Sequence, residues 1–232
     1  HGTLANKLSK KLSQPIYFVP RIYADELIKD EPDYLNDLSV ILNKEIKVFY
    51  CGKNVISQNI TKPSKIEKLL LNKIIYWDNY YANDYCPRRL FIGPYVGRKG
   101  LKNFMINPTG LINTDLLILD IITNTINQTN PNKEWLKTLN NHKVPLIFHS
   151  IKTFFLKPDF GFRPLLRTYK VNTKYFEALE ILLWSWKGPL SREWYPYLFG
   201  LKHDLQINQR ILASERITKT QTQPLAEYIH KI

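Results

Sequence analysis

The stretch IIYWDNYYANDYCPRRLFIGPYVGR, residues 74–98, decides how the rest of the chain is interpreted. Its first residues, 74–76, are apolar and β-prone without alternation, which predicts a strand buried on both faces. From Trp77 on, an indole, two carboxylates and two carboxamides follow within eight residues: Trp77, Asp78, Asn79, Asn83 and Asp84. We expect these residues just past the strand end, where parallel strands place ligand-binding groups, and their donors and acceptors suit hydroxyl-rich ligands. An Asn- and Asp-rich turn is the plain alternative, but it does not account for the ordered block at 88–98.

Helical and strand patterns alternate on both sides of this stretch. Apolar spacing predicts helices at 3–12, 31–43 and 64–72, and strands at 16–19, 46–50, 74–77 and 102–106. Apolar strands joined by helices indicate a parallel α/β sheet with crossover connections. Four such units correspond to the C-terminal half of a (β/α)8 TIM barrel, which is the fold we expect.

The pattern becomes almost wholly helical after residue 111. Helices are predicted at 111–127, 133–139, 147–155, 173–186, 192–201 and 203–217. A stretch interrupted by Pro and Gly lies between the third and fourth of them. We therefore expect the half-barrel with its closing helices at 1–157, a linker at 158–171, and the start of an α-helical domain at 172–232.

Composition excludes several classes of function. The longest apolar runs are too short for a transmembrane helix. Neither the five histidines nor the two cysteines, Cys51 and Cys86, show metal-ligand spacing, and two cysteines make no disulfide framework. We expect no cofactor and no metal; the few cysteines favour a cytoplasmic location, although the missing start of the protein leaves it unassigned. The formal charge of +13 is spread over the helices, so nucleic acid is not the expected partner.

The motifs WDN, AND-Y and RLF-GPY-GR, in this order, resemble the β-N-acetylglucosaminidases of glycoside hydrolase family 84, which include protein O-GlcNAcases and bacterial hyaluronidase-like enzymes. The resemblance extends more thinly to about Ile16 and Pro108. It implies a retaining hydrolase that removes terminal β-linked GlcNAc from glycans or glycoproteins. In this family the substrate's own acetamido oxygen attacks the anomeric carbon and forms an oxazoline.

The resemblance also implies which residues hold the sugar. They are Tyr23, Trp77, Asn79, Asp84 and Asn107, each at or just after a predicted strand end. The family's two adjacent catalytic Asp residues have no counterpart, because the chain contains no Asp-Asp dipeptide. We expect that pair upstream of His1, which makes this chain a fragment that is inactive by itself.

Two other functions remain open at this point. A carbohydrate-binding or scaffolding protein could keep the pocket and lack the acid–base pair. A basic nucleic-acid-binding module is favoured by charge alone. The sequence assigns neither the natural aglycone nor an oligomeric state.

Overall fold

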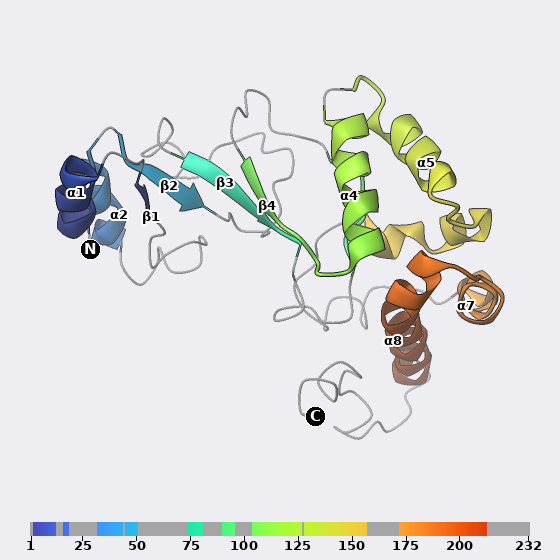
Figure 1. Cartoon of the computed structure of the whole chain (residues 1–232). Coiled ribbons are helices and arrows are strands. Elements are labelled where there is room, and N and C mark those ends of the chain that lie inside the picture. Colours follow the sequence, from blue (N-terminus) through green and yellow to red (C-terminus); the bar gives the residue numbers. More distant parts are fainter. Residues whose placement is uncertain are drawn as a thin grey trace. The chain divides into compact units, whose positions relative to one another are not determined.

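The computed structural model describes residues 2–12, 16–18, 32–43, 45–50, 74–80, 90–95, 104–126, 128–156 and 172–212. The chain divides into two compact units. We call them the sheet unit, His1–Tyr80 with Gly97–Asn107, and the helical unit, Tyr81–Val96 with Pro108–Ile232. Figure 1 shows the elements of each.

The sheet unit contains four parallel strands in the order in which they occur along the chain. They are β1 (Tyr17–Phe18), β2 (Lys47–Tyr50), β3 (Ile74–Asn79) and β4 (Phe104–Asn107). Two helices accompany them, α1 (Gly2–Lys11) before β1 and α2 (Pro32–Ile41) between β1 and β2. The parallel α/β arrangement predicted from the alternating pattern is confirmed for these elements. The helix predicted at 64–72 lies outside the described residues.

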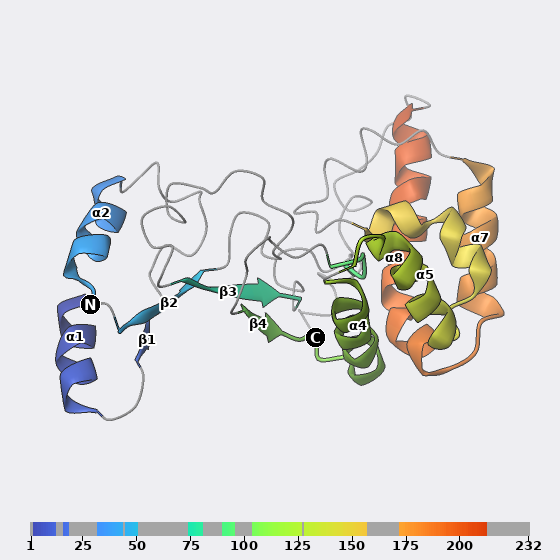
Figure 2. The same cartoon turned by 90° about the horizontal axis from the view of Figure 1, so that it is seen from above.

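Among the described elements, α1 and α2 cover one face of the sheet. We call the opposite face, on which no described helix of this unit packs, the uncovered face. The side chains of Val48 and Ile74 are buried in a core with Ala5 of α1 and Leu42, which follows α2. Figure 2 shows both helices beside β1 and β2. Of the three residues expected to be buried on both faces, Ile74 is buried, while Ile75 and Tyr76 are half-buried.

A single asparagine joins α1 to the end of α2. The Asn6 amide donates to the carbonyl oxygen of Ile41 at 2.5 Å, and its own oxygen accepts from the Asn43 backbone N–H at 2.9 Å. These bonds satisfy backbone groups at the C-terminal end of α2 that no further helical turn could satisfy. They fix the two helices against one another.

The helical unit is built from four α-helices and two 3-10 helices within the part of it that the structure describes. In chain order they are α4 (Ile112–Thr125), α5 (Pro131–Asn141), η2 (Leu146–Ser150), η3 (Lys152–Phe155), α7 (Thr173–Trp184) and α8 (Pro189–Leu212). Helix α4 packs on α5 and α8, and α7 packs on α8 and η2. Asparagine caps begin α5 and α7: Asn130 accepts from the N–H of Lys133, and Asn172 from that of Lys174.

Three of the predicted helices differ in form from the structure. The segment predicted as a helix at 147–155 is two 3-10 helices separated at Ile151. The helix predicted at 192–201 and the described part of the one predicted at 203–217 form one helix, α8, which continues through Pro196 and Gly200 and ends at Leu212. In α8, burial of one face against α4 and α7 outweighs the local tendency of Pro and Gly to end a helix.

The apolar segment 90–95 belongs to the core of the helical unit. The backbone N–H of Ile92 donates to Phe155, and its carbonyl accepts from the Trp135 indole at 2.6 Å. A Cβ on Gly93 would lie 2.6 Å from the Leu156 carbonyl oxygen, so only glycine fits there. The motif LFIGPY is therefore explained by packing.

Helices that are long and apolar enough to cross a membrane do not occur among the described residues. The linker predicted at 158–171 lies wholly within the segment 157–171, outside the described residues. The domain boundaries at 157 and 172 stay a prediction.

Candidate functional site

Two of the five predicted sugar-binding residues are described in full. Trp77 lies in β3 and Asn107 ends β4, and both side chains are half-buried. Asn79 is described as the last residue of β3, without its side chain. Tyr23 and Asp84 lie outside the described residues.

The pairing of β3 with β4 brings the described positions together. Trp77 is in register with Met105, and Asn79 is in register with Asn107. Beyond this pair, the backbone N–H of Tyr80 donates to the Asn107 carbonyl oxygen at 2.8 Å. Both strands thus end at the same level, at the C-terminal edge of a parallel sheet, where ligands of α/β proteins bind.

Strand β3 is longer than predicted, and this changes which residues belong to the site. Trp77, Asp78 and Asn79 are part of the strand and do not follow it. Because side chains alternate along a strand, the Asp78 carboxylate lies on the face opposite to Trp77, and it is fully buried. Asp78 is consequently a core residue.

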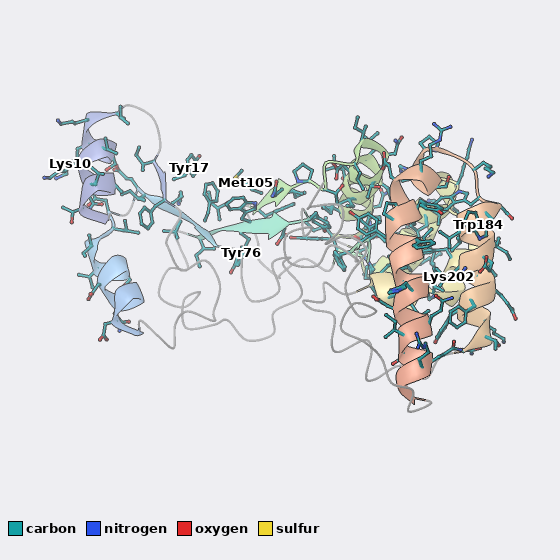
Figure 3. All side chains as sticks on the ribbon, turned by 90° about the horizontal axis from the view of Figure 1, so that it is seen from below. Lys10, Tyr17, Tyr76, Met105, Trp184 and Lys202 are labelled. Carbon is teal, nitrogen blue, oxygen red and sulfur yellow. The ribbon has the colours of Figure 1, made fainter. Side chains whose placement is uncertain are left out.

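An aromatic row crosses the uncovered face next to these residues. The rings of Tyr17 and Phe49 stack at 5.4 Å, and the Phe49 ring meets the Trp77 indole edge-on at 6.2 Å. Tyr17 is 51% exposed and Met105, beside Trp77, is 48% exposed. Figure 3 shows Tyr17 and Met105 on one side of the sheet and Tyr76 on the other.

The sequence did not predict that Tyr17, Phe49 and Met105 share the face of Trp77. A signal was available, because residues 47–50, KVFY, alternate between the two faces once Val48 is assigned to the core. The short strand β1 gives only one position to each face, so pairing partners were needed to place Tyr17.

The side chains at this edge suit a neutral polar ligand that has one apolar face. Trp77 offers a flat apolar surface, and Asn107 offers both a donor and an acceptor. Within the described part of the chain, no three His, Cys, Asp or Glu side chains are grouped so that they could hold a metal ion.

Comparison with sequence models of protein families shows the family to which the chain belongs. The sequence model of the beta-N-acetylglucosaminidase family, NAGidase, matches residues 2–145, which is more than half of the chain. The chain belongs to the β-N-acetylglucosaminidase family. The match includes every described element of the sheet unit, the segment 90–95, α4 and α5.

Curated relatives agree with this assignment. The chain is 31% identical over 119 residues to the Protein O-GlcNAcase of Rattus norvegicus and equally similar to that of Mus musculus. The aligned part covers 46% of this chain and 13% of each relative, so the alignment spans a small part of the relatives' length.

Solved structures share the fold over most of the chain. A mutant of the Thermobaculum terrenum O-GlcNAc hydrolase superposes with a TM-score of 0.57 at 23% identity, covering 89% of this chain and 52% of that one. The protein CpGH84B gives the same TM-score at 16% identity, with coverage of 92% and 48%. At these identities the likeness shows a common fold: a mixed α/β structure with a parallel sheet.

Proposed function

We propose that this chain is the sugar-holding part of a retaining β-N-acetylglucosaminidase that removes terminal β-linked GlcNAc from glycans or glycoproteins. The observation that carries the proposal is the pairing of β3 with β4, which brings Trp77 and the two asparagines, Asn79 and Asn107, to one edge of a parallel sheet. Family membership adds the expectation that this edge holds an acetamido sugar.

The proposed roles follow from the chemistry of each residue. Trp77 forms the wall against the acetamido methyl group, while Asn79 and Asn107 hydrogen-bond the acetamido group and ring hydroxyls. Asp84 accepts hydrogen bonds from the outer hydroxyls, and Tyr23 donates near the acetamido group. All five act by binding the sugar, so none of them transfers the catalytic proton.

The reaction itself would be substrate-assisted. The acetamido oxygen attacks the anomeric carbon as the glycosidic bond breaks, and water then opens the oxazoline with overall retention. A pair of adjacent Asp residues supplies the proton to the leaving group and orients the acetamido group. We infer that a segment outside this chain contributes that pair.

The same proposal accounts for the uncovered face of the sheet. In a closed eight-stranded barrel the helices lie outside and the opposite face of each strand points into the packed interior. The aromatic row of Tyr17, Phe49 and Trp77 lies on the face opposite to α1 and α2, as interior residues of a barrel would. We infer that four further strands complete the barrel.

Substitutions in the intact enzyme test the binding roles. Asp84→Ala removes two charge-assisted hydrogen bonds of about 1.5–3 kcal/mol each, so kcat/KM should fall on the order of a hundredfold. Asn107→Ala should lower kcat/KM by about tenfold, as expected for one or two neutral bonds. Asn36→Ala on the exposed surface of α2 is the matched control and should leave kcat/KM unchanged.

The dependence on the leaving group separates binding from acid catalysis. Loss of a binding residue should slow aryl glycosides with good and poor leaving groups equally, and the pH optimum should stay in place. Asp84→Asn should keep part of the activity because the carboxamide oxygen still accepts. A loss confined to poor leaving groups would instead identify Asp84 as the general acid and contradict the proposal.

A non-catalytic carbohydrate-binding protein is the second candidate. It is favoured by one observation, the absence of an Asp-Asp dipeptide from all 232 residues. The two functions differ in the intact protein: the enzyme turns over aryl GlcNAc substrates, whereas the binding protein retains GlcNAc affinity without turnover.

A further inference from the structure

The helical unit contains a hollow that is separate from the residues proposed to hold GlcNAc. Its volume is 320 Å³, at the small end of ligand pockets and suited to one sugar ring. Three parts of the helical unit form it: the beginning of α4, the end of α5 and the turn between α7 and α8. Its lining includes Asn113, Leu116, His142, Lys143, Trp186 and Leu190.

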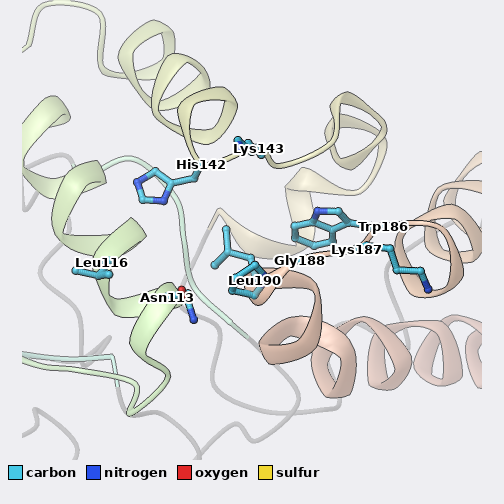
Figure 4. A pocket seen from close by; sticks show the side chains of 9 residues that line it. Asn113, Leu116, His142, Lys143, Trp186, Lys187, Gly188 and Leu190 are labelled. Atoms are coloured by element: carbon cyan, nitrogen blue, oxygen red, sulfur yellow. The ribbon is translucent and has the colours of Figure 1, made fainter.

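Trp186 differs from the other tryptophans of this unit. The indoles of Trp135, Trp184 and Trp194 each donate to a protein oxygen, at 2.6, 2.7 and 3.0 Å. The indole N–H of Trp186 donates to no described residue. Its ring is half-buried, held edge-on against the Trp194 ring at 5.4 Å, and forms one wall of the hollow (Figure 4). A fixed aromatic face with an available donor beside it suits a hydroxyl-bearing ring.

Other groups in the lining also keep hydrogen-bonding capacity. Asn113 uses its amide nitrogen on Glu193 at 2.7 Å, which leaves its oxygen as an acceptor. His142 uses Nε2 on Asp120 at 2.7 Å, which leaves Nδ1. Lys143 is exposed and forms no ion pair with a described residue. The combination of donors and acceptors matches hydroxyl groups, which are both.

The charge of the lining argues against a strongly anionic ligand. Lys187 donates to the carbonyl oxygen of Trp184 at 3.0 Å, and its side chain runs away from the other lining residues (Figure 4). The His142 ring is paired with a carboxylate. Because the Lys187 side chain runs away from the lining, Lys143 is the one cationic group without a carboxylate partner that remains beside the described lining residues, too little to select a phosphate.

We propose that this hollow is a second carbohydrate site, which takes one sugar ring of a glycan against Trp186. It goes beyond the proposed hydrolase activity, since none of its residues belongs to the sheet. An accessory site of this kind would raise the effective concentration of a glycan-bearing substrate without taking part in the reaction.

Indole N–H resonances in NMR spectra of the ¹⁵N-labelled intact protein test the proposal. The probes are methyl β-glucoside, N-acetylglucosamine and glucuronate, added separately at millimolar concentration, with the Trp186 signal identified by its loss in Trp186→Phe. We expect at least one probe to shift this signal in a saturable way. The Trp184 signal is the internal control, and Trp77 reports on the proposed GlcNAc pocket, so failure of one site is distinguishable from failure of the other.

Affinities from calorimetry give a second measurement that does not depend on the spectra. Lys143→Asn keeps a residue that tolerates the positive φ of 58° at this position and should weaken binding at this site by about tenfold. Trp184→Phe should leave the affinity unchanged. The proposal is overturned if no probe shifts the Trp186 signal, or if Trp186→Phe and Lys143→Asn both bind as tightly as the wild type.

Discussion

Glu193 in α8 holds the beginning of α4. Its two carboxylate oxygens accept four hydrogen bonds, from the backbone N–H groups of Asn113 and Thr114 and from both side chains, at 2.6–3.0 Å. The Thr114 hydroxyl also accepts from the Trp194 indole. A carboxylate at a helix N-terminus satisfies N–H groups that have no partner within the helix and interacts favourably with the helix dipole.

These contacts set the pKa of Glu193. Burial by itself raises the pKa of this carboxyl group, but the hydrogen bonds from Thr114 and Asn113 together outweigh burial and hold the pKa below its ordinary value. A depressed pKa in the folded state means that the carboxylate stabilises the fold above the pKa of the unfolded chain. This contribution is lost as the pH falls through the folded-state pKa.

Glu193→Gln should therefore destabilise the protein in a pH-dependent manner. At pH 7 the free energy of unfolding should fall by about 2–3 kcal/mol, because Gln brings two N–H donors toward groups that are themselves donors. At a second, acidic pH below the ordinary range of a Glu carboxyl group, the difference from the wild type should be smaller, because protonation of Glu193 removes the contribution of its carboxylate as the pH falls toward the lowered folded-state pKa. Urea unfolding at both pH values measures this. Glu177→Gln, exposed on α7, is the matched control, and a pH-independent difference for Glu193→Gln would contradict the argument.

At single positions, the sequence predicted which residues lie at the sheet edge better than it predicted the face to which each side chain points. Trp77 and Asn107 lie at the predicted sheet edge, but Asp78, which looked equally suited to a ligand loop, is buried on the opposite face. When Asp78 belongs to the strand, alternation directs its side chain to the face opposite to Trp77, whereas in a loop its direction would be free. Where the strand ends depends on its pairing with the neighbouring strand. That information is absent from a local pattern.

Among the elements, the segment 146–155 shows where helical spacing misleads. Phe148, Ile151 and Phe154 recur every third residue and are all buried. A three-residue period matches the 3.0 residues per turn of a 3-10 helix, whereas an α-helix would rotate these side chains away from a common line. Phe155 is buried too, so the apolar spacing by itself did not separate a 3-10 helix from an α-helix.

Ile151 at the junction of η2 and η3 should be the sensitive position of this segment. Its side chain is fully buried, so Ile151→Ala should lower the free energy of unfolding by about 2–5 kcal/mol. Leu146, the first residue of η2, is 68% exposed, and Leu146→Ala should change it by less than about 0.5 kcal/mol. Chemical denaturation of the two variants compares them directly. Equal losses would show that the segment does not pack as a three-residue period.

For the whole molecule, alternation of apolar patterns was sufficient to predict a parallel sheet and a helical region. It could not predict how the segment 90–95 is used. That segment follows β3 in sequence, yet it is packed among Trp135, Thr125 and Phe155 of the helical unit. Long-range packing of this kind depends on which surfaces remain uncovered after the local elements form.

Proteolysis tests the expected boundary near residues 158–171. If 172–232 begins a domain of its own, limited trypsin digestion should cut first within this Pro- and Gly-interrupted stretch, at Arg167 or Lys170. Mass spectrometry of the earliest fragments identifies the site. First cleavage at Lys174 in α7 would contradict the boundary, because that helix would then open before the linker.

The uncovered sheet face should behave differently in the separate chain and in the intact protein. In the chain by itself, Met105 and Tyr17 expose apolar surface on β4 and β1, whose outer edges pair with no described strand, and this favours association. In a closed barrel the same side chains would be packed in the interior. A charge at position 105 should therefore help the separate chain and harm the intact protein.

Met105→Lys makes this contrast measurable. The soluble fraction of the 232-residue chain, assayed by sedimentation, should rise. The intact protein should lose about 2–7 kcal/mol for a buried, unpaired polar group, which lowers Tm by roughly 5 °C or more. Val40→Lys on α2, where the side chain is 85% exposed, adds the same charge and should leave the Tm of the intact protein unchanged. If Met105→Lys were as harmless there as Val40→Lys, this face would be open to solvent in the intact protein too, and the proposed closed barrel would be wrong.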